Sequence, residues 1–345
     1  FVNDAQLIRG IIQYQQKKSG EAEASLAAFI QNAPFSEQSS AELKADRTQA
    51  LALLATLCAD KSPPDFASAQ SHLITLHAEN PNSPEALRTA IYVAAKAAEA
   101  QNWTVVADML TPVAERLVQS NDLSLLTLVK AQLSLNRPEA VINQPQTLAN
   151  ITKLLASIAQ DPNKAGKEGF VVDAVWRVVR ALQAAGKTAE ADQLITAVFN
   201  AYPQSQEAAN RLWNDSQNLR KTDAVRADAL LERLLGLTAD KQLADDAHYE
   251  LGRSAYSQKN YGQVIKHCQT LIQHEKYGDT ALGLLCQSAY ELKDYNAAVE
   301  YCTTYQATYK DGQSIAAVKG IYARACLAKA ELLTSAKPEA AAEGK

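Results

Sequence analysis

A chain of 345 residues is long for one compact domain, because single hydrophobic cores stop growing near roughly 250–300 residues. We therefore expect two lobes or an extended repeat array. Glycine is scarce at 13 residues, aromatic residues make up 6% of the chain, and few stretches alternate apolar and polar residues, so helices are favoured over strands. The net charge of -4 excludes the broad cationic surface of a typical nucleic-acid-binding protein, and no apolar run approaches the roughly 20 residues that span a bilayer.

Residues 1–136 are predicted to form an N-terminal lobe of helical hairpins. The clearest hairpin has its first helix at residues 49–58, begins its second helix at Phe66 and ends at Pro81, because proline cannot continue a helix. Residues 10–34 and 84–117 fit the same scheme less closely, and Trp103 takes the place of Phe66 in the second of them.

Residues 137–170 are predicted to be an irregular junction between two lobes. Prolines and glycines interrupt this segment five times, at Pro138, Pro145, Pro162, Gly166 and Gly169, and both residue types end regular elements. A single helix is expected within the junction, over residues 147–160.

Residues 171–333 are predicted to form a C-terminal lobe that contains the strongest internal repeat. The lobe begins with a hairpin over residues 176–203 and an irregular one over 206–237, and it ends with a closing helix over 315–333. Between them, residues 251–256 match residues 285–290 at a separation of 34 positions, and Tyr261 matches Tyr295 at the same separation. Residues 334–345 are low in complexity and are expected to be disordered.

Each copy of this repeat has the pattern of an amphipathic helix, a short polar turn, an aromatic residue and a second amphipathic helix. Tyr261 and Tyr295 are expected to wedge between neighbouring helices, so truncation to alanine is expected to cost about 3–5 kcal/mol. Small side chains are expected where the two helices cross, namely Gly252 with Val264 and Cys286 with Ala298.

The period and its small, aromatic and small-apolar landmarks resemble the tetratricopeptide repeat (TPR). The resemblance implies an all-α fold, a right-handed α-solenoid of antiparallel helix pairs, whose first helices line a concave groove for a partner protein or peptide. Residues 80–86 and 202–208 each combine a proline, a serine able to cap the next helix and a glutamate in its first turn. Such connections look like those in repeat proteins of the bacterial cell envelope, including Tol-Pal accessory and outer-membrane assembly lipoproteins. This similarity implies a bacterial envelope assembly or secretion complex, including a membrane-associated one, and ranks the periplasm or cell envelope ahead of the cytoplasm.

The sequence lacks the common motifs of nucleotide, zinc and redox chemistry. The sequence contains no Gly-x-Gly-x-x-Gly, Walker, His-Glu-x-x-His or Cys-x-x-Cys motif, so we expect neither a cofactor nor a metal. His248, together with His267 beside Cys268, could begin a metal site, but ordinary packing is the favoured interpretation because consecutive helical residues face different directions. A disulfide between Cys268 and Cys286 is the less favoured alternative to buried free thiols.

Function is therefore expected on the groove surface. Two hypotheses stay open: a non-catalytic protein-interaction scaffold, which is favoured, and an all-helical enzyme or accessory domain of an enzyme with a central cleft. Tyrosine and arginine are common at binding hot spots. The residues predicted to line the groove are Trp176, Arg180, Tyr249, Arg253, Tyr256, Gln287 and Tyr290.

Overall fold

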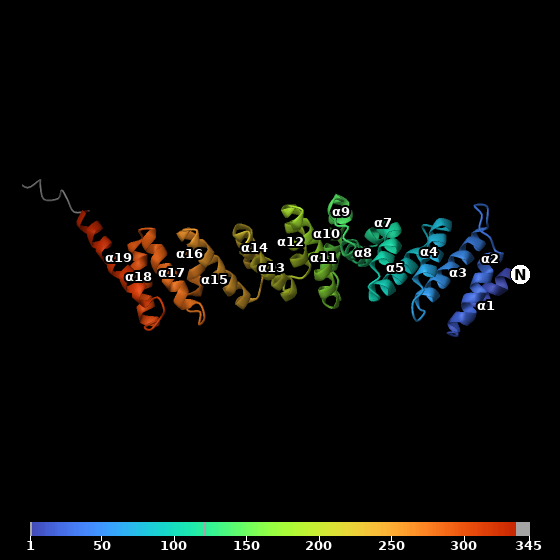
Figure 1. Ribbon diagram of the computed structural model, residues 1–345, viewed down its shortest axis with the longest axis horizontal. Helices are drawn as coiled ribbons and strands as arrows, with labels where there is room; N and C mark the ends of the chain where they lie inside the picture. The colour runs from blue at the N-terminus through green and yellow to red at the C-terminus, as the bar shows by residue number, and fades with distance from the viewer. Residues whose placement is uncertain (1, 121, 336–345) are drawn as a thin grey trace, which may run out of the picture. The chain divides into compact units, whose positions relative to one another are not determined.

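The computed structural model describes residues 2–120 and 122–335, in two compact units, Phe1–Ala201 and Tyr202–Lys345. Each unit is a run of helices paired in chain order, which can be followed by colour in Figure 1. Within the described residues every regular element is an α-helix or a short 3-10 helix, so the predicted all-α solenoid of helix pairs is confirmed. None of these helices is both long and apolar enough to cross a membrane.

Unit 1 is built mainly from four helix pairs, α1 with α2, α3 with α4, α5 with α6 and α11 with α12. The predicted second helix at Phe66 is α4, which begins at that residue behind the side-chain cap of Asp65. The helices of this unit are α1 (Val2–Gln15), α2 (Ser19–Asn32), α3 (Ala41–Ala59), α4 (Phe66–Glu79), α5 (Pro84–Glu99), α6 (Trp103–Leu110), η1 (Thr111–Val113), α7 (Ala114–Gln119), α8 (Ser124–Ser134), α9 (Glu139–Ile142), α10 (Pro145–Ala159), η2 (Lys164–Lys167), α11 (Glu168–Ala184) and α12 (Thr188–Ala201).

Unit 2 contains three helix pairs and the predicted closing helix. The helix pairs are α13 with α14, α15 with α16 and α17 with α18, and the closing helix α19 packs on both α17 and α18. The helices of this unit are α13 (Gln206–Leu219), α14 (Ala224–Leu237), α15 (Lys241–Ser257), α16 (Tyr261–Cys268), η3 (Gln269–Leu271), α17 (Gly278–Glu291), α18 (Tyr295–Thr308) and α19 (Ile315–Ser335).

The same backbone motif ends six of the described helices, namely α8 and the first helices of five pairs, α1, α5, α11, α15 and α17. A residue in the left-handed conformation follows the helix, the amide of that residue donates to the carbonyl three positions earlier, and the next amide donates to the carbonyl five positions earlier. This pair of bonds is the Schellman motif, which satisfies carbonyls left open at a helix end. Glycine is the usual left-handed residue, yet only one of the six is glycine. They are Lys17, Gln101, Asn136, Gly186, Lys259 and Lys293.

The strongest sequence repeat corresponds to two nearly identical hairpins. The side chains of Asn260 and Asp294, 34 residues apart, cap α16 and α18 by accepting hydrogen bonds from backbone amides three residues later. Gly252 lies at the expected crossing, because a Cβ atom there would come within 2.6 Å of Cys268 Sγ. The other expected crossing residues, Val264, Cys286 and Ala298, are fully buried.

Tyr261 and Tyr295 are half-buried. The ring of Tyr261 lies 6.3 Å from the ring of Tyr256, and the ring of Tyr295 lies 5.8 Å from that of Tyr290, between centroids. Each tyrosine thus packs between the two helices of its hairpin while part of its ring meets solvent. The energetic expectation of about 3–5 kcal/mol assumed full burial, so a smaller cost of about 1–2 kcal/mol follows from the structure.

A buried tyrosine connects the helix pair α17 and α18 to the start of α19. Tyr305 on α18 is fully buried and its hydroxyl donates to the Asp279 carboxylate on α17. The same hydroxyl accepts a 3.0 Å hydrogen bond from the amide of Ser314, just before α19, and Asp279 accepts one of 3.1 Å from the amide of Gln313. These bonds fix α17, α18 and the start of α19 relative to one another.

The segment predicted as an irregular junction, residues 137–170, is more regular than expected and lies within unit 1. Pro138 precedes α9 and Pro145 is the first residue of α10, where a missing amide proton costs nothing. Helix α10, close to the helix expected at 147–160, packs on α12, and its buried residues include Ile151 and Leu155. The two compact units divide after Ala201 and not within this segment. The tail predicted at 334–345 lies outside the described residues from position 336 onward, and α19 extends to Ser335.

Candidate functional site

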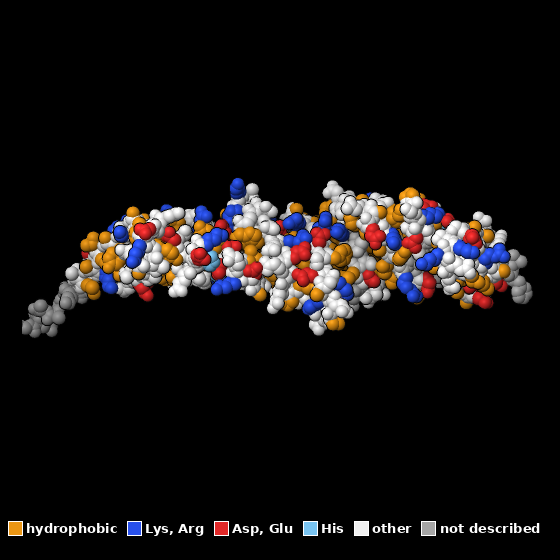
Figure 2. All heavy atoms as spheres, turned by 90° about the horizontal axis from the view of Figure 1, so that it is seen from below, with side chains coloured by type: hydrophobic (Ala, Val, Ile, Leu, Met, Phe, Trp, Pro, Cys, Tyr) orange, Lys and Arg blue, Asp and Glu red, His pale blue; other side chains and the backbone are white. Residues whose placement is uncertain are grey.

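Two helices of unit 2, α15 and α17, carry most of the predicted groove residues, and α19 packs beside α17. Helix α15 contacts α17, and α17 contacts α19. Tyr249, Arg253 and Tyr256 are spaced four and three residues apart on α15, which places them on one face of this helix. Gln287 and Tyr290 lie three residues apart on α17. In Figure 2, acidic and basic side chains are interspersed along the visible face of the described residues rather than separated by sign.

Tyr249 on α15 is part of an aromatic stack. The rings of Tyr249 and Tyr277 are stacked, with centroids 4.1 Å apart and planes inclined by 19°, and the His274 ring is stacked 4.8 Å from Tyr277. The Tyr277 hydroxyl donates to Asp246, and burial followed by this hydrogen bond raises the pKa of Tyr277. Tyr277, which links α15 to the segment before α17, was missed from the sequence because it lies outside any periodic helix pattern.

Two arginines lie over tyrosine rings of this surface. The guanidinium carbon of Arg253 lies 5.6 Å from the centroid of Tyr249, and that of Arg324 on α19 lies 5.1 Å from the centroid of Tyr290. We call Arg253–Tyr249 and Arg324–Tyr290 the arginine–tyrosine pairs. Neither guanidinium forms an ion pair with a carboxylate of residues 2–120 or 122–335, so both cations remain available to an anionic group.

The nearby carboxylates, by contrast, already have partners. Asp246 accepts from Tyr277 and lies 3.9 Å from Lys276 Nζ, and Asp245 lies 3.7 Å from His274 Nε2. Asp245 and Asp246 thus have partners on this surface, whereas the guanidinium groups of Arg253 and Arg324 have no carboxylate partner among the described residues. The other two predicted groove residues are also accessible in part: Tyr256 is 36% exposed, and half-buried Gln287 donates to Glu291.

The prediction for Trp176 is wrong. Its side chain on α11 is fully buried and cannot contact a partner in a groove. The physical reason is that α11 packs against α8, α9 and α12 and buries apolar residues on nearly every side, including Val171, Val175 and Val178. Arg180 on the same helix is exposed and borders a shallow depression with Pro138 in unit 1.

The two histidines considered as metal ligands contact each other. The Nδ1 atoms of His248 and His267 lie 3.1 Å apart, and His267 Nε2 lies 3.0 Å from Glu232. Burial is the main cause that lowers the pKa of both histidines. No group of three or more metal-ligating side chains comes together within the described part of the chain.

All five cysteines are free thiols, so the Cys268–Cys286 disulfide is not formed. Burial raises the pKa of Cys268 to about 12.

Comparisons with known proteins give no functional assignment. No protein-family model matches the sequence, and no curated protein matches it. Solved structures similar to this chain include the P58(IPK) TPR domain, with 12% identity, a TM-score of 0.29 and coverage of 98% of this chain and 100% of that one. The TPR2AB domain of yeast Sti1 in its pHSP90 complex has 14% identity, a TM-score of 0.30 and coverage of 81% and 99%. Cut9–Hcn1 of the APC/C has 13% identity, a TM-score of 0.28 and coverage of 95% and 70%. Scores of this size carry no argument, so the TPR-like fold rests on the repeated helical hairpins of the chain itself.

Proposed function

We propose that this chain is a non-catalytic scaffold that binds a partner protein or peptide through the α15, α17 and α19 surface of unit 2. The observation that carries the proposal is the presence of two arginine–tyrosine pairs on contacting helices, each with an uncompensated guanidinium. Arginine and tyrosine are enriched at hot spots, and a stacked guanidinium still offers its fork of N–H donors to a carboxylate.

The chemistry of the surface favours a partner segment that carries carboxylates. Tyr249 is held by stacking on Tyr277 and Arg253 by its contact with Tyr249, so these side chains lose little conformational entropy when a partner binds. A charge-assisted bond to an arginine is stronger than a neutral hydrogen bond. From the resemblance of the connecting segments at residues 80–86 and 202–208, we further propose a bacterial envelope assembly or secretion complex as the setting, including a membrane-associated one.

The test begins with a pull-down of partners from the native source by the full chain, followed by calorimetric titration of the purified partner. Arg253→Ala and Arg324→Ala should each weaken binding by about thirtyfold, which corresponds to the roughly 2 kcal/mol of a hot-spot truncation. Arg253→Lys should recover only part of the affinity, because lysine keeps the charge but loses the planar fork.

Matched controls come from the second helices of the same hairpins. Gln263 on α16 and Thr303 on α18 are exposed, so their replacement by alanine should leave both folding and affinity nearly unchanged. Equal affinity of the arginine variants and these controls would remove the α15, α17 and α19 surface from consideration. Added salt should also weaken binding, because it screens exposed charge pairs. If the arginine variants weaken binding but the affinity does not depend on salt concentration, the carboxylate part of the proposal is refuted.

A further inference from the structure

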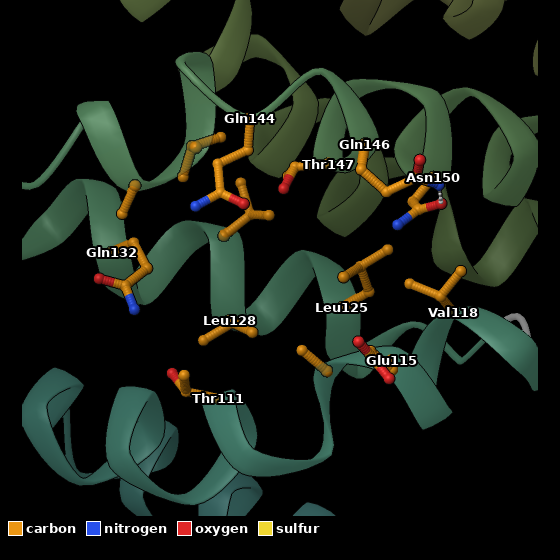
Figure 3. A pocket seen from close by; sticks show the side chains of 14 residues that line it. Thr111, Glu115, Val118, Leu125, Leu128, Gln132, Gln144, Gln146, Thr147 and Asn150 are labelled. Carbon is orange, nitrogen blue, oxygen red and sulfur yellow. Dashed lines mark hydrogen bonds between the residues drawn. The ribbon is translucent and has the colours of Figure 1, made fainter.

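Unit 1 contains a cavity of about 330 Å³ that the proposed function does not use. Helix α8 forms its back wall, η1 and α7 border one side, and α9 and α10 border the other (Figure 3). Four apolar side chains form its floor and are all buried: Leu125, Leu128, Val129 and Val141. The volume lies near the lower end of the roughly 300–1,000 Å³ typical of ligand sites.

Uncharged polar side chains surround this apolar floor. Gln132 comes from α8, Gln144 precedes α10, and Thr147 and Asn150 lie on α10. In Figure 3 the side chains of Gln144 and Thr147 point from above toward Leu125 and Leu128. Glu115 is the one ionisable residue of the lining, so the cavity offers both donors and acceptors but hardly any charge.

Several of these polar groups have no intramolecular partner. Within the described residues, the side chains of Gln144 and Thr147 make no hydrogen bond, and the buried Gln132 Oε1 has no donor. A buried carbonyl oxygen without a donor is costly, and a carboxamide can turn to present either its oxygen or its nitrogen to a ligand. Asn150, by contrast, already accepts a 3.0 Å hydrogen bond from Gln146.

The dimensions of the floor match a short extended peptide. Its α8 residues run from Leu125 to Gln132 through two turns, a length of about 10 Å at 1.5 Å per helical residue. About three residues of extended chain cover the same length at roughly 3.3 Å each. The volume of the cavity equals that of about eleven water molecules at roughly 30 Å³ each. This volume has room for one aliphatic side chain and its neighbouring peptide groups.

We propose that this cavity binds an uncharged, extended peptide segment whose central aliphatic side chain enters the floor formed by Leu125 and Leu128. Carboxamides both donate and accept, so Gln132 and Gln144 can pair with the N–H and C=O groups of peptide bonds. Glu115 disfavours a carboxylate at this position. The ligand thus differs in charge from the carboxylate-bearing segment proposed for unit 2, and the two sites can be tested separately.

The probe is acetyl-Ala-Leu-Ala-N-methylamide, titrated into the full chain while amide and side-chain resonances are followed by NMR. We expect saturable shifts confined to the elements that line the cavity, η1, α7, α8, α9 and α10, and a Kd near the millimolar range that suits so small a ligand. The acidic analogue acetyl-Asp-Leu-Asp-N-methylamide should bind at least tenfold more weakly. Gln144→Ala should weaken the neutral probe by about tenfold, whereas Gln119→Ala, at an exposed position outside the cavity, should not.

Two further measurements keep the outcome decisive. Ala140 is exposed and lines the cavity, so Ala140→Leu should fill the site and abolish the shifts while the helical circular dichroism stays unchanged. Isoamyl alcohol provides the aliphatic group without peptide bonds. The peptide assignment would be overturned if the alcohol bound with the same affinity as the neutral peptide probe. It would also be overturned if Gln144→Ala and Gln119→Ala bound the probe equally well, or if no saturable shift occurred.

Discussion

The left-handed turn residues provide the sharpest test of the backbone, and Lys293→Gly is the most informative substitution. Lys293 has a φ of 62°, a conformation that costs a residue with a Cβ atom roughly 1–2 kcal/mol. Glycine avoids this cost but loses about 0.5–1 kcal/mol more chain entropy on folding. The difference predicts that Lys293→Gly raises the free energy of unfolding by about 0.5–1 kcal/mol. Urea unfolding followed by far-ultraviolet circular dichroism measures it, and the slope against urea should stay constant.

Three other positions of the chain calibrate this prediction. Gly186 has a φ of 76°, and no neighbouring atom lies within 4 Å of the point where a Cβ atom would stand, so Gly186→Ala should destabilise by about 1 kcal/mol through backbone strain alone. Asn136→Gly should gain less than Lys293→Gly, because asparagine tolerates the left-handed region. Lys319 is exposed within α19, where glycine should cost about 1 kcal/mol. A loss of stability in Lys293→Gly equal to that in Lys319→Gly would refute the Schellman turn at Lys293.

Three further predictions concern packing and pH. Gly252→Ala should destabilise by about 1–3 kcal/mol in thermal unfolding because its Cβ would clash with Cys268, whereas Gly262→Ala, in open space on α16, should be neutral or stabilising by up to about 1 kcal/mol. Tyr295→Ala should lower the free energy of unfolding by about 1–2 kcal/mol, and a loss near 4 kcal/mol would show that the ring is enclosed. Burial lowers the folded-state pKa of His248 and His267 below the usual value, so the unfolded chain binds more protons and stability should fall as pH drops through 6.5 toward the folded-state values. His248→Asn should flatten this part of the stability profile, and an unchanged pH slope in that variant would contradict the assignment.

The helical hairpins were predictable because their signals are local. The 34-residue period aligns Asn260 with Asp294, and both cap a helix as the pattern of polar turn and aromatic residue indicates. The turns themselves were not recognised, since lysine or glutamine in the left-handed conformation lacks the glycine signal that normally marks it. The regular structure of residues 137–170 was also missed, because Pro138 and Pro145 stand where helices begin rather than where they break.

Placing the site residues required tertiary information. The position of Trp176 in its hairpin predicted a groove residue, but α11 packs against three other helices. The periodicity of the sequence does not show how many helices pack against a given helix. Tyr277 lies between η3 and α17, where no periodicity assigns a face. Its stacking on Tyr249 depends on two segments brought together only by the packing of α15 against α17.

The two nearly identical hairpins also separate structural tyrosines from candidate binding residues. At the 34-residue spacing Tyr256 corresponds to Tyr290, and each packs its ring against the tyrosine that begins the next helix. A ring contact that recurs in both hairpins is explained by their packing, so the binding role proposed for the arginine–tyrosine pairs rests on their arginines. Tyr249 and Arg253 correspond instead to Gly283 and Gln287, so neither side chain belongs to the packing that the two hairpins share. Tyr249 also packs against the core of unit 2 and on Tyr277, whereas Arg253 is exposed. Arg253 is therefore the residue whose loss should separate binding from folding most cleanly.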